Sequence, residues 1–278
     1  MSVGVALLAG DTIIVASDGV STIHGEGPTG FPQSVRFPAG PKFELVDAGL
    51  IVCYAATVRD EALAILDNTK EWWKSKNPKP TQHRVGEFAL GLHENASRIW
   101  YPPAMPDTVR QHVLTQQDER GVQFFIAGYN TEGPSKQYST PFLYSISSPH
   151  FRPLPLRQWG DIGMVTTSTS LLTQFYSDQL NAEQALELVV FTVTQSMLDP
   201  SLERYVGGTF YAAQLTPNHA YEMAIESRGD YWDLYDPTKD FEKYRQLHER
   251  VKALTKRYAQ KLFGESEQPE ESPEETNS

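Results

Sequence analysis

The order of strand-like and helix-like segments constrains the fold of this chain more than any single motif. Short apolar or β-branched segments, typical of strands, lie at residues 3–8, 12–17, 42–46, 50–56, 122–130, 141–147, 162–167, 209–216 and 220–226. Segments rich in helix formers lie at residues 59–76, 82–99, 169–180 and 182–197. The two kinds come in blocks rather than in alternation, which predicts an α+β fold in which helices cover antiparallel sheets.

The segments between these elements are expected to be turns and irregular structure. Ala9-Gly10-Asp11 joins the first two strands and suits a tight hairpin turn. Residues 21–41 are rich in Gly and Pro and are expected to form a loop, and residues 100–120, with three prolines, are expected to be irregular. The second helix is expected to bury one face, formed by Val85, Phe88, Leu92, Ala96 and Ile99.

Charge and composition narrow the classes of partner. The net charge of −11 argues against nucleic acid or an anionic membrane, because binding to phosphate depends on clustered Lys and Arg. The single cysteine, Cys53, lies in an apolar segment and is expected to be a buried, inert thiol. The seven His residues are scattered without ligand spacing, so we expect neither a metal nor another cofactor.

Targeting signals are absent from the sequence. No apolar run reaches the length of about 18 residues that a membrane span needs. The start of the chain lacks the basic stretch and apolar run of a secretory signal. We therefore expect a cytoplasmic protein with no membrane partner.

One main domain is expected, followed by two short segments. Residues 1–238 hold all the strand and helix blocks described above. Residues 239–263 place apolar side chains at helical spacing and predict an amphipathic helix that docks on a neighbouring subunit or on the helices of its own chain. Residues 264–278 contain six Glu and no basic residue, which predicts a disordered acidic tail.

Five stretches, taken in order, resemble the proteasome β-type family of the N-terminal nucleophile (Ntn) hydrolases, as in bacterial and archaeal proteasome-like subunits. They are residues 3–19, 42–66, 122–133 with 141–147, 166–170 and 207–223. The resemblance covers most of residues 2–226. It implies a four-layer αββα sandwich, in which two antiparallel sheets lie between two helical layers.

In that family the residue at the mature N-terminus supplies both the nucleophile and its base, and Ser2 matches this residue once Met1 is removed. A hydroxyl is a weak nucleophile near neutral pH and needs a nearby base. An α-amine, with a pKa of about 7.7–8.0, can accept the hydroxyl proton. A nearby cation would lower the pKa of the amine further, and Lys42 is the candidate, with Asp18 pairing with it and keeping it charged.

The family's site residues can be matched to this sequence one at a time. Asp18 corresponds to the acidic residue that ends the family's second strand, and Lys42 corresponds to the lysine that opens its third strand. The family's fixed separation between that lysine and the oxyanion-hole glycine leads to Ala56. Ser168 resembles the accessory serine of the T-G-S-G segment, and Glu203 replaces the aspartate of the Asp-x-x-Ser-Gly-Gly element.

The sequence departs from the family pattern in two places. Counting back from Asp18 places Ser2 at the nucleophile position, whereas counting from Val3-Gly4 makes the chain start two residues too late. The register of the first hairpin decides between the two counts. In addition, Val206 replaces the serine of the Asp-x-x-Ser-Gly-Gly element and has no hydroxyl to hold the N-terminal amine.

Two classes of function fit these observations. The first is an N-terminal serine, threonine-type endopeptidase or amidohydrolase that cleaves peptide bonds through an acyl-enzyme on Ser2; an amidase or peptide ligase with one dedicated substrate would use the same intermediate. The second is a non-catalytic proteasome-like subunit for assembly or peptide binding. The family's α-type subunits carry an extension before the first strand, so the short segment before residue 3 favours the hydrolase.

The resemblance also implies partners. Proteasome-like subunits assemble into closed rings or open helical assemblies that confine hydrolysis to an interior chamber. We therefore expect a homo-oligomer that takes peptides or unfolded proteins as substrate, with an ATP-dependent unfoldase as a candidate partner.

Overall fold

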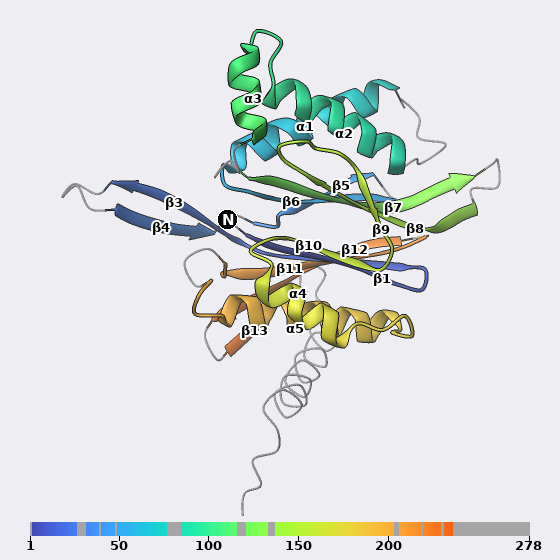
Figure 1. Ribbon diagram of the computed structural model, residues 1–278. Coiled ribbons are helices and arrows are strands. Elements are labelled where there is room, and N and C mark those ends of the chain that lie inside the picture. Colours follow the sequence, from blue (N-terminus) through green and yellow to red (C-terminus); the bar gives the residue numbers. More distant parts are fainter. Residues whose placement is uncertain are drawn as a thin grey trace, which may run out of the picture.

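The computed structural model describes residues 2–26, 32–38, 40–47, 49–76, 85–115, 121–132, 137–202, 206–217, 219–228 and 231–235. These residues form two antiparallel sheets, a separate two-stranded hairpin and five helices (Figure 1). The α+β class expected from the order of the segments is therefore confirmed.

The two sheets differ in how far apart in the sequence their neighbouring strands lie. The five-stranded sheet follows the chain, in the order β5 (Phe43–Asp47), β6 (Leu50–Ala56), β7 (Val122–Glu132), β8 (Gln137–Ser147) and β9 (Leu154–Leu156). The six-stranded sheet joins distant segments, in the order β10 (Trp159–Gly163), β1 (Val3–Ala9), β2 (Thr12–Asp18), β11 (Thr209–Thr216), β12 (His219–Arg228) and β13 (Tyr231–Tyr235). The start of the chain is thus enclosed by strands from the middle and the end of the domain.

The helices fall into two groups on opposite sides of the sheets (Figure 1). One group is α1 (Arg59–Lys76), α2 (Val85–Trp100) and α3 (Asp107–Thr115); α1 and α2 pack on the five-stranded sheet. The other is α4 (Thr166–Phe175) and α5 (Ala182–Leu198); α5 packs on β1 and β2, and α4 packs on α5 and β10. No helix in the described ranges is long and apolar enough to cross a membrane.

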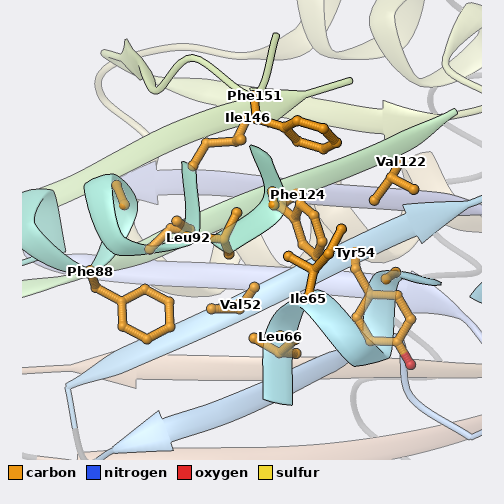
Figure 2. Packing of buried hydrophobic residues seen from close by; sticks show 14 of the residues in the cluster. Val52, Tyr54, Ile65, Leu66, Phe88, Leu92, Val122, Phe124, Ile146 and Phe151 are labelled. Carbon is orange, nitrogen blue, oxygen red and sulfur yellow. The ribbon is translucent and has the colours of Figure 1, made fainter. Parts of the chain in front are cut away.

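Three clusters of buried apolar side chains hold the sheets and helices together. One lies between the two sheets and joins Ile13 and Val15 of β2 to Ile51 of β6 and Phe125 of β7. A second lies between α1, α2 and the five-stranded sheet and includes Phe88 (Figure 2). The third lies between α4, α5 and the six-stranded sheet. Each large apolar side chain buried in this way contributes about 1.5–3 kcal/mol, so the clusters fix which faces of the two sheets meet.

The prediction of a loop over residues 21–41 is wrong. β3 (Val20–Glu26) and β4 (Pro32–Pro38) pair as an antiparallel hairpin that extends away from the rest of the fold (Figure 1). In the sequence, Gly27, Pro28 and Gly30 separate the two strands. The Gly and Pro content of the whole segment predicted a loop, although two short strands lie within it.

Residues 100–120 are not irregular throughout, because α3 begins at Asp107. All three prolines of this segment precede that residue, where they do not interrupt a helix. Two strands, β9 and β13, were not expected, and the strand expected near residues 162–167 instead ends at Gly163. The helix expected at residues 169–180 is α4, which begins and ends earlier.

Some expectations about individual residues can also be compared with the structure. Four of the five apolar positions on α2 are buried as expected, but Ile99 is 38% exposed. Cys53 is buried, and burial raises the pKa of its thiol to about 12, in agreement with an inert cysteine. The helix expected at residues 239–263 and the tail expected at 264–278 lie outside the described residues.

Candidate active site

The register of the first hairpin sets the position of Ser2 relative to Asp18. β1 and β2 pair with Gly4 opposite Ser17. The backbone N–H of Val3 donates to Asp18 Oδ1 at 3.0 Å. In this register Ser2 directly precedes the residue whose amide contacts the Asp18 carboxylate, and its assignment as the nucleophile stays a prediction.

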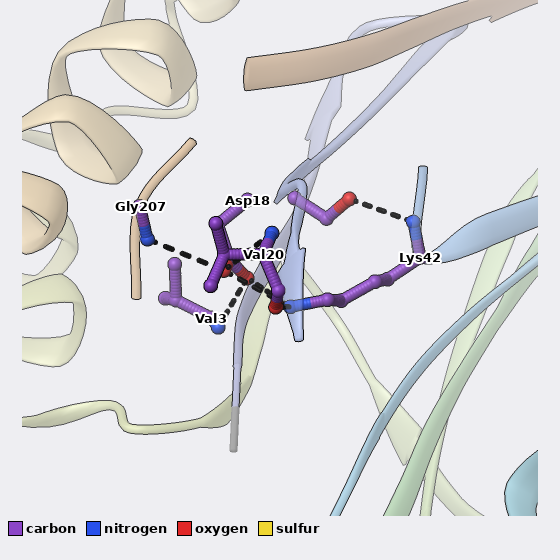
Figure 3. A network of polar contacts seen from close by, with 6 residues as sticks. Val3, Asp18, Val20, Lys42 and Gly207 are labelled. Atoms are coloured by element: carbon purple, nitrogen blue, oxygen red, sulfur yellow. Dashed lines mark hydrogen bonds and ion pairs between the residues drawn. The ribbon is translucent and has the colours of Figure 1, made fainter. Parts of the chain in front are cut away.

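A buried ion pair lies beside this contact (Figure 3). Lys42 directly precedes β5, and its Nζ donates to Asp18 Oδ1 at 2.9 Å, to Asp18 Oδ2 at 3.0 Å and to the carbonyl oxygen of Val20. Asp18 is 0% exposed and Lys42 is 3% exposed. The backbone N–H of Lys42 donates to Ser17 Oγ at 3.1 Å, which joins the start of β5 to the end of β2.

Backbone amides from two other segments complete the surroundings of the carboxylate. Asp18 Oδ2 accepts from the N–H of Gly207 at 3.3 Å and from the N–H of Val20 at 3.4 Å (Figure 3). The N–H of Gly19 in turn donates to the carbonyl oxygen of Gly207 at 3.3 Å. Asp18 therefore connects the start of β1, the end of β2 and the segment that leads into β11.

Burial and pairing act in opposite directions on this ion pair. Burial lowers the pKa of Lys42 and raises the pKa of Asp18, and the attraction between the two charges opposes both shifts. The three hydrogens of an ammonium group match the three acceptors around Nζ. Backbone N–H donors that face the carboxylate also favour its ionised form. The Lys42 Nζ therefore has its three acceptors within this buried cluster.

The peptide group between Ser2 and Val3 is held at both of its polar atoms. Its N–H donates to Asp18, as described above, and the carbonyl oxygen of Ser2 accepts from the N–H of Met164 at 2.8 Å. Gly163 lies opposite Val3 in the pairing of β1 with β10. Ser2 is 5% exposed. Its backbone is thus fixed between β2 on one side and the end of β10 on the other.

Gly163 can approach Ser2 this closely only because it is a glycine. Its φ is +84°, a conformation that residues with a side chain rarely adopt. A Cβ at this position would overlap the carbonyl oxygen of Ser2 and lie 2.8 Å from its carbonyl carbon. The same Cβ would lie 3.2 Å from the Cβ of Ala55, near the end of β6. The ends of β1, β6 and β10 therefore meet at this glycine.

Ala56, the expected oxyanion-hole position, is the last residue of β6 and pairs with Val122 of β7. It is half-buried and directly follows Ala55. The structure thus places Ala56 on the strand end that approaches Ser2.

Of the two expected accessory residues, the structure describes Ser168 but not Glu203. Ser168 is buried in α4, and its hydroxyl donates to Asp161 Oδ2 at 2.9 Å and to the carbonyl oxygen of Val165 at 3.0 Å. Asp161 also accepts from Thr169 Oγ1 at 2.6 Å. Among the described residues, Ser168 therefore bonds within β10 and α4 rather than to the Asp18–Lys42 pair. Glu203 lies outside the described residues, and its role stays a prediction.

Several contributors to this site were missed by reasoning from the sequence. The contact of the Gly207 amide with Asp18 was not predicted, although Gly207 was matched to the Asp-x-x-Ser-Gly-Gly element. A Gly-Gly pair before a strand indicates that another part of the backbone approaches closely. Gly163 and Met164 carry no motif, because they act through backbone geometry.

The charged residues of the described part of the chain do not group as metal ligands do. No set of three or more His, Cys, Asp or Glu residues in that part could hold a metal ion. The described groups that meet here are the Ser2 residue and the buried Asp18–Lys42 ion pair.

The fold can be compared with those of known proteins. No family model and no curated protein sequence matches this chain. Its structure nevertheless has a proteasome-like fold. One solved structure that it resembles is the Gly-1 mutant of Anbu, a bacterial proteasome-like protein of the Ntn-hydrolase family, from Hyphomicrobium sp. strain MC1. The TM-score is 0.61 at 13% sequence identity, over 95% of this chain and 97% of that chain.

Proposed function

We propose that this protein is a proteasome-like Ntn hydrolase that cleaves peptide bonds through an acyl-enzyme on Ser2, after removal of Met1. The observation that carries the proposal is the buried Asp18–Lys42 ion pair, which contacts the backbone next to Ser2. Buried charges are costly, so a pair kept beside a chain start is a candidate for a functional role.

The arrangement of the helices supports a finer statement about the fold. The α1–α2 group packs on one sheet and the α4–α5 group packs on the other, and the two sheets share an apolar cluster. We propose that these parts form the four-layer αββα sandwich of the Ntn hydrolases.

The proposed reaction has two steps. Ser2 Oγ attacks the carbonyl carbon of the scissile amide, and the α-amine of Ser2 takes the hydroxyl proton and passes it to the leaving nitrogen as the C–N bond breaks. Water then attacks the resulting ester, which releases the acid and restores the Ser2 hydroxyl. The Lys42 charge lowers the pKa of the amine, so more of the amine is neutral and able to act as a base.

The remaining expected residues take supporting roles in this proposal. The N–H of Ala56 would donate to the oxyanion that forms on the attacked carbonyl. By the resemblance to the family, Ser168 and Glu203 would help to orient the N-terminal amine. Asp18 would hold Lys42 and the Val3 amide in place.

The proposal is tested by comparing Ser2→Ala with Ser2→Thr. Thr keeps a hydroxyl and an α-amine, whereas Ala keeps only the amine. The rate at which a fluorophore-labelled unfolded protein is cleaved should fall by at least about 10²–10⁴-fold in Ser2→Ala and be largely retained in Ser2→Thr. Equal cleavage by wild type and Ser2→Ala would contradict the assignment, and no cleavage by either would favour the non-catalytic, structural subunit.

We further propose that the protein works in the cytoplasm as a homo-oligomer, in a ring or an open helical assembly, on peptide or unfolded protein substrate delivered by an ATP-dependent unfoldase. The proteasome-like fold supports assembly. Light scattering coupled to size-exclusion chromatography should give a mass several times the 31.2 kDa of one chain. Truncation after residue 238 should reduce that mass if the 239–263 segment docks on a neighbour. A full-length chain that elutes as a monomer across the accessible concentration range would contradict assembly.

A further inference from the structure

The carboxamide of Gln123 lies at a point where packing alone would favour an apolar side chain. Gln123 is the second residue of β7, and the residues at alternate positions after it, Phe125, Ala127 and Tyr129, are buried in the cluster between the two sheets. Successive side chains of a strand point to opposite faces, so Gln123 faces the same side as these three. Gln123 is half-buried, lies near the start of β7 and pairs with Ala55 of β6.

This carboxamide makes one short, well-placed hydrogen bond. Gln123 Oε1 accepts from the backbone N–H of Gly163 at 2.6 Å. The next N–H along the chain, that of Met164, donates to the carbonyl oxygen of Ser2 at 2.8 Å. Gly163 itself pairs with Val3, and a Cβ on it would overlap that carbonyl oxygen. Gln123 therefore fixes the turn at the end of β10 whose two residues contact Ser2.

We infer that Gln123 is a positioning residue for Ser2. It holds the Gly163 amide, which sets the direction of the Met164 N–H and so the orientation of the Ser2 carbonyl group. Together with the Asp18 contact on the Val3 amide, this fixes the Ser2 peptide and hence the place of the Ser2 hydroxyl and amine. The inference rests on the proposed function, because positioning matters for catalysis only if Ser2 is the nucleophile.

Two substitutions separate the hydrogen bond from the bulk of the side chain. Gln123→Met keeps the length of the side chain and removes the acceptor, whereas Gln123→Glu keeps an acceptor oxygen for the Gly163 amide. Gln158→Met is a matched control, since Gln158 directly precedes the other end of β10 and its exposed side chain donates to Asp178 at 2.7 Å. The control removes a side-chain hydrogen bond from the same segment without touching Ser2.

The first measurement is the rate at which a β-lactone acylates Ser2, followed by intact-mass spectrometry. Misplacing a reacting group by about 1 Å can cost about 10²-fold in rate, so Gln123→Met should be slower by about that factor. Gln123→Glu and Gln158→Met should stay within about threefold of wild type. Thermal unfolding should show a folded Gln123→Met chain. Acylation of Gln123→Met at the wild-type rate would overturn the inference.

The second measurement does not depend on catalysis. Hydrogen–deuterium exchange of the peptide that contains Met164 should be faster in Gln123→Met than in wild type and unchanged in Gln158→Met, because the Met164 N–H loses its fixed direction. Unchanged exchange in Gln123→Met would overturn the inference. Faster exchange in a protein whose wild-type form takes no β-lactone would support the positioning of the Ser2 peptide and contradict the proposed function instead.

Discussion

Lys42→Met is expected to abolish most of the activity and to destabilise the fold, both by large amounts. In the proposed mechanism the substitution removes the positive charge that lowers the pKa of the Ser2 amine, which should slow acylation by about 10²–10⁴-fold. It also leaves the fully buried carboxylate of Asp18 without its counter-charge, which should cost about 3–5 kcal/mol in the free energy of unfolding. Met has a similar length, so little of the loss comes from an unfilled cavity.

The pH dependence of this variant identifies the cause of the destabilisation. Without Lys42, burial raises the pKa of Asp18 with no ion pair to oppose it. A carboxyl whose pKa is higher in the folded state than in the unfolded state adds stability at low pH and loses it as pH rises. The difference in melting temperature between wild type and Lys42→Met should therefore become smaller as the pH is lowered from about 8 to about 5.

A double variant provides the control for Lys42→Met. Asp18→Asn combined with Lys42→Met contains no buried charge at this position, so its melting temperature should lack the pH trend and exceed that of Lys42→Met at about pH 8. Circular dichroism at both pH values measures these differences. A Lys42→Met protein as stable as wild type at about pH 8 would show that the ion pair is not buried as described.

Gly163→Ala is the second substitution with a large expected effect. The added Cβ would overlap the Ser2 carbonyl group, which is backbone and has little room to move. The φ of +84° adds further strain, of about 1–3 kcal/mol. We expect the Ser2 peptide to shift away from Met164 and the acylation of Ser2 to slow by about 10²-fold or more.

Gly10→Ala separates these two causes. Gly10 also has a positive φ, +60°, in the turn between β1 and β2, but a Cβ there would meet no atom within 4 Å. Gly10→Ala should therefore lose about 1 kcal/mol of stability and keep wild-type acylation. If Gly163→Ala and Gly10→Ala behave alike in the acylation assay, the close approach of Gly163 to Ser2 has no functional role.

The sequence predicted those parts of the fold whose signals are local. The α1 boundaries, the β1–β2 hairpin and the apolar face of α2 follow from composition and periodicity within short windows. The β3–β4 hairpin was missed because its strands are short and its turn residues dominate the composition of the segment. β13 follows β12 after a short interruption and was not distinguished from the end of the domain.

The candidate site shows the same limit more clearly. The resemblance to the proteasome β-type family predicted that Asp18 and Lys42 would pair, and the structure brings them together. The contacts of Ser2 with Met164 and Gly163 depend on the pairing of β1 with β10, two segments more than 150 residues apart in sequence. Such contacts become visible only when strand order and register are known.

Intact-mass spectrometry with a β-lactone shows directly whether Ser2 becomes an N-terminal nucleophile. We expect a wild-type chain that has lost Met1 and gains the mass of one reagent, and a Ser2→Ala chain that has lost Met1 but gains none. A chain that retains Met1, or a processed wild-type chain that takes no reagent, would contradict it.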